Sequence, residues 1–123
     1  GLPYSNGVML PGTGSFVSAV QTGGARSQVD AICGKPNRLL LDYVCDKFSI
    51  RDRQRVCMVG DRLETDIKMG NLGGVNTLAV LSGVVTESQL LNVKDKDEEP
   101  HYVMSHLGAI YEHLGNNDGN NEP

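Results

Sequence analysis

The chain has 123 residues, which suit one domain or part of one, and its formal net charge is −4. Its basic residues form no run that would suit a nucleic acid or a membrane surface, and no apolar stretch approaches the roughly 18 residues of a membrane span. We therefore expect no nucleic-acid partner and no membrane partner. Cys33, Cys45 and Cys57 lack metal-ligand spacing, and we expect free thiols in a reducing, cytoplasmic location.

Helix and strand patterns alternate along the chain after a connector, rich in Gly and Pro, at residues 1–13. Spacing and turn residues predict, in order, a helix over 14–23, a strand over 29–33, a helix over 38–48, a strand over 55–60, a helix over 66–72, a strand over 76–81, a helix over 87–92, a strand over 101–104 and a helix over 105–114. Asn37 is the expected N-cap of the second of these helices. The alternation is typical of βαβ units, so the predicted fold class is α/β, with a parallel sheet flanked by helices.

The remaining segments are polar. Residues 94–99, KDKDEE, are expected to form a solvated loop, and residues 116–123 a disordered tail because their composition is low in complexity. The expected core includes the larger apolar side chains of the helices and of the second strand, namely Phe16, Phe48, Met58 and Met69.

Two acids stand where the strand 55–60 meets the next helix, in the stretch VGDRLETDI. Asp61 directly follows the strand, and ligands of parallel sheets bind outside the carboxyl ends of strands. Asp66 lies at the predicted helix start, where capping alone could explain it, since the helix dipole favours an anion there by about 0.3–1 kcal/mol. Asp61 is harder to explain as a cap. Together the two acids indicate a Mg²⁺ site, because this small cation binds one or two carboxylates plus phosphate oxygens and water.

Lys35 lies in the stretch CGKPN, between Gly34 and Pro36, which restrict the backbone around it. A lysine on a surface loop is usually a solvated charge. Here it follows an apolar stretch and precedes a predicted helix, so it is also a candidate to contact a phosphate oxygen or an anionic nucleophile.

The segments GKPN (34–37) and MVGDRLETDI (58–67) together resemble the third and fourth motifs of the haloacid-dehalogenase-like (HAD) phosphatases. Three further segments, PGTGS (11–15), LSGV (81–84) and PHYVMSHLGAI (100–110), are similar to the branch of p-nitrophenylphosphatases, phosphoglycolate phosphatases and chronophin (pyridoxal phosphate phosphatase). The resemblance extends from Pro11 to Leu114. It implies that the chain is the C-terminal half of a Rossmann-like HAD core.

The resemblance also implies an activity: Mg²⁺-dependent hydrolysis of a phosphomonoester, such as a small phosphorylated metabolite or p-nitrophenyl phosphate, through an aspartyl-phosphate. Asp61 would be the magnesium ligand of the fourth motif. Asp66 would orient the site, and Lys35 would balance the charge between the nucleophile and the phosphoryl group of the substrate. The substrate stays open among phosphoglycolate, pyridoxal phosphate and aryl phosphates.

Two motifs of the family have no counterpart in this sequence: the DxDGT segment that carries the nucleophile, and the Ser or Thr of the second motif that would bind the phosphoryl group. The only DxD is Asp95-Lys96-Asp97, in the charged loop. We expect the nucleophile and most of the cap domain to precede residue 1, so that residues 1–10 are the end of the cap or a linker, 11–115 the C-terminal half of the core and 116–123 the tail. The chain alone is then expected to be inactive.

The alternative is a non-catalytic α/β binding or assembly module, which would have no need for Lys35, Asp61 and Asp66 together. In HAD-like cores the nucleophile strand pairs beside the strand that ends at the fourth-motif acid, here 55–60. Without that partner the strand would have an unpaired apolar edge, and we expect the chain to self-associate as a homodimer near it.

Overall fold

The computed structural model describes residues 2–25 and 28–115. The chain forms two compact units, Gly1–Ile32 and Cys33–Pro123. In the first unit, strands β1 (Leu2–Pro3) and β2 (Met9–Leu10) pair in antiparallel fashion. Helix α1 (Thr13–Gly23) follows them, which confirms the predicted helix over 14–23.

Two expectations for this unit are wrong. Phe16 is 66% exposed rather than buried, because α1 and a hairpin of two-residue strands offer little apolar surface to cover it. Residues 29–33 form no strand, and Val29 and Ile32 are exposed. A strand exists only where a neighbour accepts its backbone hydrogen bonds, and none of the described strands pairs with this segment.

The second unit contains the predicted parallel sheet. Its strands are β3 (Cys57–Gly60), β4 (Asn76–Val80) and β5 (Tyr102–Met104), in the spatial order β3-β4-β5. Both neighbouring pairs are parallel; Gly60 lies opposite Ala79, and Val80 lies opposite Met104. The helices of this unit are α2 (Leu39–Lys47), α3 (Lys68–Leu72), α4 (Glu87–Leu91) and α5 (Ala109–Gly115).

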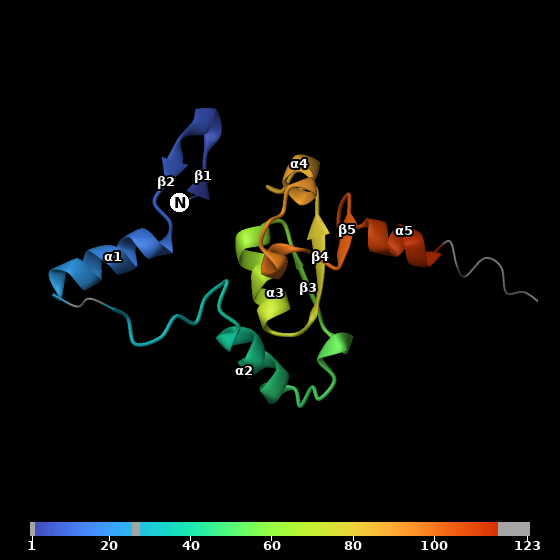
Figure 1. The fold of residues 1–123 in the computed structure, drawn as a ribbon, viewed down its shortest axis with the longest axis horizontal. Coiled ribbons are helices and arrows are strands. Elements are labelled where there is room, and N and C mark those ends of the chain that lie inside the picture. The colour runs from blue at the N-terminus through green and yellow to red at the C-terminus, as the bar shows by residue number, and fades with distance from the viewer. Residues whose placement is uncertain (1, 26–27, 116–123) are drawn as a thin grey trace, which may run out of the picture. The chain divides into compact units, whose positions relative to one another are not determined.

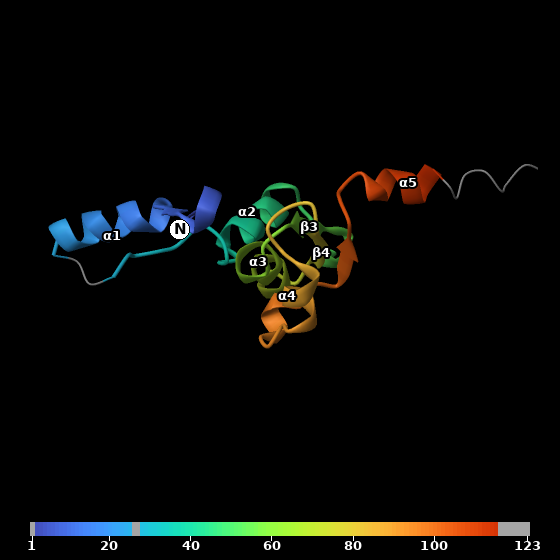
Figure 2. The same cartoon turned by 90° about the horizontal axis from the view of Figure 1, so that it is seen from above.

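Helix α3 connects β3 to β4 and packs on both strands, while α4 lies in the connection from β4 to β5 (Figures 1 and 2). The buried cluster beneath these connections consists of Leu63, Ile67, Ala79 and Val85. Fully burying a Leu, Ile or Val side chain, such as the three in this cluster, stabilises the fold by about 1.5–3 kcal/mol. The core therefore includes residues of the segments that follow β3 and β4, and their burial fixes where those segments leave the sheet.

Helix α2 confirms the predicted helix over 38–48, but its start differs. Asn37 does not cap it: the Asn37 N–H donates to the Gly34 carbonyl at 3.1 Å and closes a turn, and Arg38 takes the cap position without a side-chain hydrogen bond. Phe48, expected in the core, is 67% exposed just after the helix ends. Asp42 of α2 binds Arg38 and Arg53, whose guanidinium groups lower the pKa of the Asp42 carboxyl.

The helix predicted over 66–72 begins earlier than expected. A wide, π-helical turn, Leu63–Ile67, precedes α3, so Asp66 lies inside the helical segment rather than at its first residue. The turn and α3 together make one continuous path from the end of β3, with Ile67 fully buried in the core.

The acidic loop 94–99 is anchored rather than only solvated. Lys68 Nζ contacts Asp95 Oδ2 at 2.6 Å and Glu98 Oε1 at 3.2 Å across a short helical turn, Lys96–Glu98. The hydrogen bond from Lys68 lowers the pKa of Asp95, and Asp95 in turn raises the pKa of Lys68.

The predicted tail, 116–123, lies outside the described residues. No helix within residues 2–25 or 28–115 combines the length and the apolar character needed to cross a bilayer.

Candidate functional site

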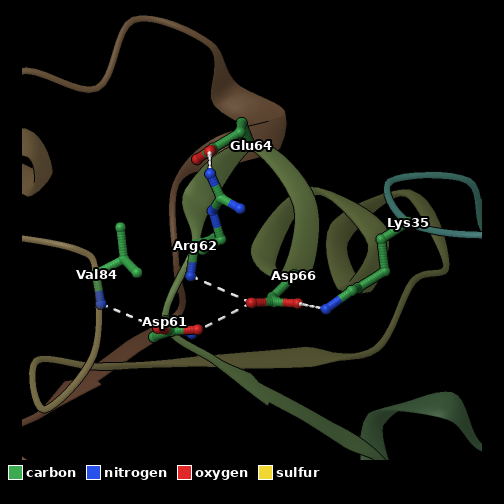
Figure 3. A network of polar contacts seen from close by, with 6 residues as sticks. All are labelled: Lys35, Asp61, Arg62, Glu64, Asp66 and Val84. Carbon is green, nitrogen blue, oxygen red and sulfur yellow. Dashed lines mark hydrogen bonds and ion pairs between the residues drawn. The ribbon is translucent and has the colours of Figure 1, made fainter. Parts of the chain in front are cut away.

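The three residues singled out by their sequence context, Lys35, Asp61 and Asp66, meet at the carboxyl end of β3 (Figure 3). Lys35 comes from the turn before α2, Asp61 from the residue after β3, and Asp66 from the π-helical turn. The sheet brings together residues that are far apart in the chain, since Lys35 and Asp66 are 31 positions apart.

Asp66 is the centre of this arrangement and is only 3% exposed. Its Oδ2 accepts hydrogen bonds from the backbone N–H groups of Asp61, at 3.3 Å, and of Arg62, at 3.2 Å. Its Oδ1 contacts Lys35 Nζ at 2.5 Å. A buried carboxylate is stable only when its oxygens are paired in this way, so Asp66 ties the start of the turn to the lysine.

Gly60 makes this placement possible because the Asp66 side chain packs directly on its backbone. A Cβ at position 60 would overlap the Cβ of Asp66 and approach its Cγ to 2.5 Å. The last residue of β3 must therefore lack a side chain for the Asp66 carboxylate to reach the two backbone N–H groups.

Lys35 is the more exposed partner in the ion pair, since its side chain is 48% exposed whereas that of Asp66 is 5% exposed. The ammonium group has three donors, and one is directed at Asp66. The other two donors meet no acceptor within residues 2–25 or 28–115, so they are available to an anion. The arrangement thus presents a positive charge that a buried carboxylate holds in place.

Asp61 is oriented by the segment that follows β4. Its Oδ2 accepts the Val84 N–H at 2.9 Å, and its carbonyl oxygen accepts the Val85 N–H at 2.9 Å. Its other carboxylate oxygen, Oδ1, receives no hydrogen bond from residues 2–25 or 28–115. Asp61 also forms no ion pair with any lysine or arginine of these residues, so one oxygen is available to a cation.

The residues present fit a metal ion only as a partial site. Within the described parts of the chain, no three His, Cys, Asp or Glu side chains are arranged to hold a metal ion. Both Asp66 oxygens are already paired, which leaves Asp61 as the single protein ligand that this cluster offers. Mg²⁺ is bound in many sites by one or two carboxylates plus phosphate and water, so Asp61 suits it as one ligand among several.

An open pocket of about 400 Å³ borders Asp61 on the side of α4. Arg62 and Glu64, which form an ion pair at 3.2 Å, line it together with Val84, Gln89 and Lys94. Figure 3 shows the Arg62 side chain directed toward Glu64 and away from Asp66.

Residue patterns alone did not single out Gly83 and Val84, which contact Asp61 directly. Their place right after β4 could have indicated them, because the segments after neighbouring parallel strands meet at one edge of the sheet. The segment LSGV (81–84) was noted in the sequence only because it resembles the family.

Comparisons with known proteins show which proteins this chain is similar to. The profile of the HAD-hydrolase-like family matches residues 32–110. Mouse (Mus musculus) chronophin is 38% identical over 115 residues, which are 91% of this chain and 38% of that protein.

Two solved structures are also similar. The 4-nitrophenylphosphatase of Thermotoga maritima superposes with a TM-score of 0.73 at 34% identity, over 89% of this chain and 40% of that one. The glycerol phosphate phosphatase of Mycobacterium tuberculosis in complex with magnesium gives 0.67 at 33% identity, over 84% and 29%. The chain thus spans less than half the length of these relatives.

Proposed function

Because this chain belongs to the HAD-like phosphatase family, in the branch that includes p-nitrophenylphosphatases and chronophin, we propose that it carries part of the active site of a Mg²⁺-dependent phosphomonoesterase. The substrate class would be small phosphorylated metabolites or p-nitrophenyl phosphate, in keeping with the names of the relatives. The observation that supports this best is the cluster of Lys35, Asp61 and Asp66 at one sheet edge.

Each side chain has a distinct role in this proposal. Asp61 supplies one carboxylate oxygen to Mg²⁺, which when bound would neutralise charge on the phosphate. Lys35 places its ammonium group against the phosphoryl group or the nucleophile, where a fixed positive charge stabilises developing negative charge. Asp66 is a positioning residue, because it holds Lys35 and the backbone of Asp61 at once.

The nucleophile of the proposed reaction lies outside this chain. The only DxD of the sequence begins at Asp95, which is paired with Lys68 and stands on a short helical turn rather than after a strand. In the proposed reaction a carboxylate would attack phosphorus and release the alcohol. Water would then hydrolyse the aspartyl-phosphate and release inorganic phosphate. We therefore expect the 123-residue chain to leave p-nitrophenyl phosphate unhydrolysed.

The test uses a longer protein that contains both this chain and a DxDGT segment. Asp61→Asn keeps the size and the Val84 hydrogen bond but removes the charge, so we expect phosphatase activity to fall on the order of 100-fold at ordinary Mg²⁺ concentrations. Asp46→Asn, on the exposed side of α2, is the matched control. Steady-state rates over a Mg²⁺ titration measure both. Near-normal rates for Asp61→Asn would contradict the role of Asp61, and metal-dependent turnover by the 123-residue chain would contradict the placement of the nucleophile.

The same proposal extends to location and assembly. Cys33, Cys45 and Cys57 are all free thiols, which supports a reducing, cytoplasmic location. The outer edge of β3 has no partner among the described strands, which supports the expected homodimer.

A further inference from the structure

The segment after β4 is held rigidly against Asp61. Val85 is 4% exposed and belongs to the buried cluster with Leu63 and Ile67, so it anchors the segment in the core. From that anchor the Val85 N–H reaches the carbonyl of Asp61, and the Val84 N–H reaches its Oδ2, each at 2.9 Å. Two consecutive N–H groups therefore fix both the backbone and the side chain of one residue.

Gly83, the residue before Val84, lies directly against the Asp61 side chain. A Cβ at this position would stand 2.5 Å from Asp61 Cγ and would overlap Asp61 Cβ and Oδ2 as well, whereas nonbonded carbons are most stable about 3.5–4.0 Å apart. Rotation of the Asp61 carboxylate could move Cγ and Oδ2 out of the way. It could not move Cβ, whose position the backbone sets.

The requirement for glycine here is one of space and not of backbone conformation, because the φ of Gly83 lies outside the left-handed region. Any side chain at position 83 would have to push the segment away from the end of β3. That displacement would lengthen the hydrogen bond between Val84 and Asp61 Oδ2.

We propose that Gly83 is a positioning residue for the Asp61 carboxylate. Without a side chain, it lets the Val84 N–H hold Oδ2, so that Oδ1 is the oxygen left for a divalent cation. This inference rests on the proposed function, in which Asp61 is a metal ligand. It adds that the geometry of that ligand is set from β4, by a residue that touches neither metal nor substrate.

The test uses the 123-residue chain with two NMR measurements. The first, without metal, is amide hydrogen exchange at Val84. We expect Gly83→Ala to accelerate it about tenfold or more, since loss of one hydrogen bond corresponds to about that factor. The second is a titration with Mn²⁺, a paramagnetic probe, followed by line broadening at residues 60–62 and 83–85. We expect Gly83→Ala to need roughly tenfold more Mn²⁺ for the same broadening.

Two further variants separate positioning from general damage. Gly23→Ala is the matched control, because a Cβ at Gly23 would meet no atom within 4 Å; it should leave both measurements unchanged. Asp61→Gly removes all three atoms that a Cβ at 83 would meet but keeps the carbonyl that accepts the Val85 N–H, so Gly83→Ala should accelerate Val85 exchange in the unsubstituted chain and not in the Asp61→Gly background.

The exchange measurement tests the role of Gly83, and the Mn²⁺ titration tests the proposed metal ligand Asp61. Unchanged Val84 exchange in Gly83→Ala, or an equal acceleration of Val85 exchange by Gly83→Ala in the Asp61→Gly background, would overturn the role of Gly83. Absence of Mn²⁺ broadening near Asp61 in the unsubstituted chain would count against the proposed metal ligand instead, while Val84 exchange would still decide the role of Gly83.

Discussion

Asp66 shows how one buried carboxylate can serve the fold and the site together. The sequence left two interpretations open, a cap or a member of a catalytic cluster. The structure places backbone N–H groups on one oxygen and Lys35 on the other, so both kinds of contact are present. The catalytic role itself stays a prediction. Sequence reasoning could not decide between the two, because the contact with Lys35 joins residues that only the folded chain brings together.

The two partners of this ion pair should differ in their contribution to stability. Asp66→Ala removes the acceptor of two backbone N–H groups and of Lys35, and we expect it to lower the free energy of unfolding by about 2–5 kcal/mol. Lys35→Met should cost less, because the N–H groups stay paired and water can reach this half-exposed position.

Urea unfolding of the 123-residue chain measures both changes, with Lys47→Met at the exposed end of α2 as the control. A cost for Lys35→Met equal to or above that of Asp66→Ala would show that the ion pair, and not the backbone hydrogen bonds, dominates.

At the scale of elements, hydrophobic spacing predicted α1, α2 and all three strands of the parallel sheet to within a few residues. The strand over 29–33 failed, because its apolar composition could not say whether a pairing partner exists. The early helix start at Leu63 was missed for another reason. The wide turn is held by hydrogen bonds that the backbone N–H groups of Asp61 and Arg62 donate to the Asp66 carboxylate, and local helix propensity does not include such contacts.

The unpaired edge of β3 is the element with the clearest consequence. Among the described strands β3 pairs only with β4, and Cys57 is exposed at its start. We predict that the chain forms a dimer through this edge and that Cys57→Lys makes it monomeric, because a lysine on an edge strand opposes pairing with a second strand. Cys57→Ser, which adds no charge, should stay dimeric.

Light scattering coupled to size exclusion, under reducing conditions, measures the mass of all three proteins. A monomeric unsubstituted chain, or a dimeric Cys57→Lys variant, would place the association elsewhere or exclude it.

At the scale of the whole molecule, the exposed Phe16 and Phe48 mark the limit of prediction from sequence. Their apolar character favoured the core, but burial depends on which other surfaces are present, and each lies at the exterior of its own unit. The site, too, depends on which other groups surround a residue. Spacing and residue type were enough to choose Asp61, yet no three His, Cys, Asp or Glu side chains of the described residues are arranged to hold a metal ion with it.

The most direct test of the central claim is the position of a metal ion in a longer protein that contains both this chain and a DxDGT segment. Crystals grown with Mn²⁺ in place of Mg²⁺ and with a phosphate analogue would give an anomalous peak at the metal. The proposal predicts this peak at coordination distance, about 2.0–2.3 Å, from Asp61 Oδ1, with Lys35 Nζ directed at the phosphate analogue. A peak whose ligands leave out Asp61, with its carboxylate still bound only by Val84, would contradict it.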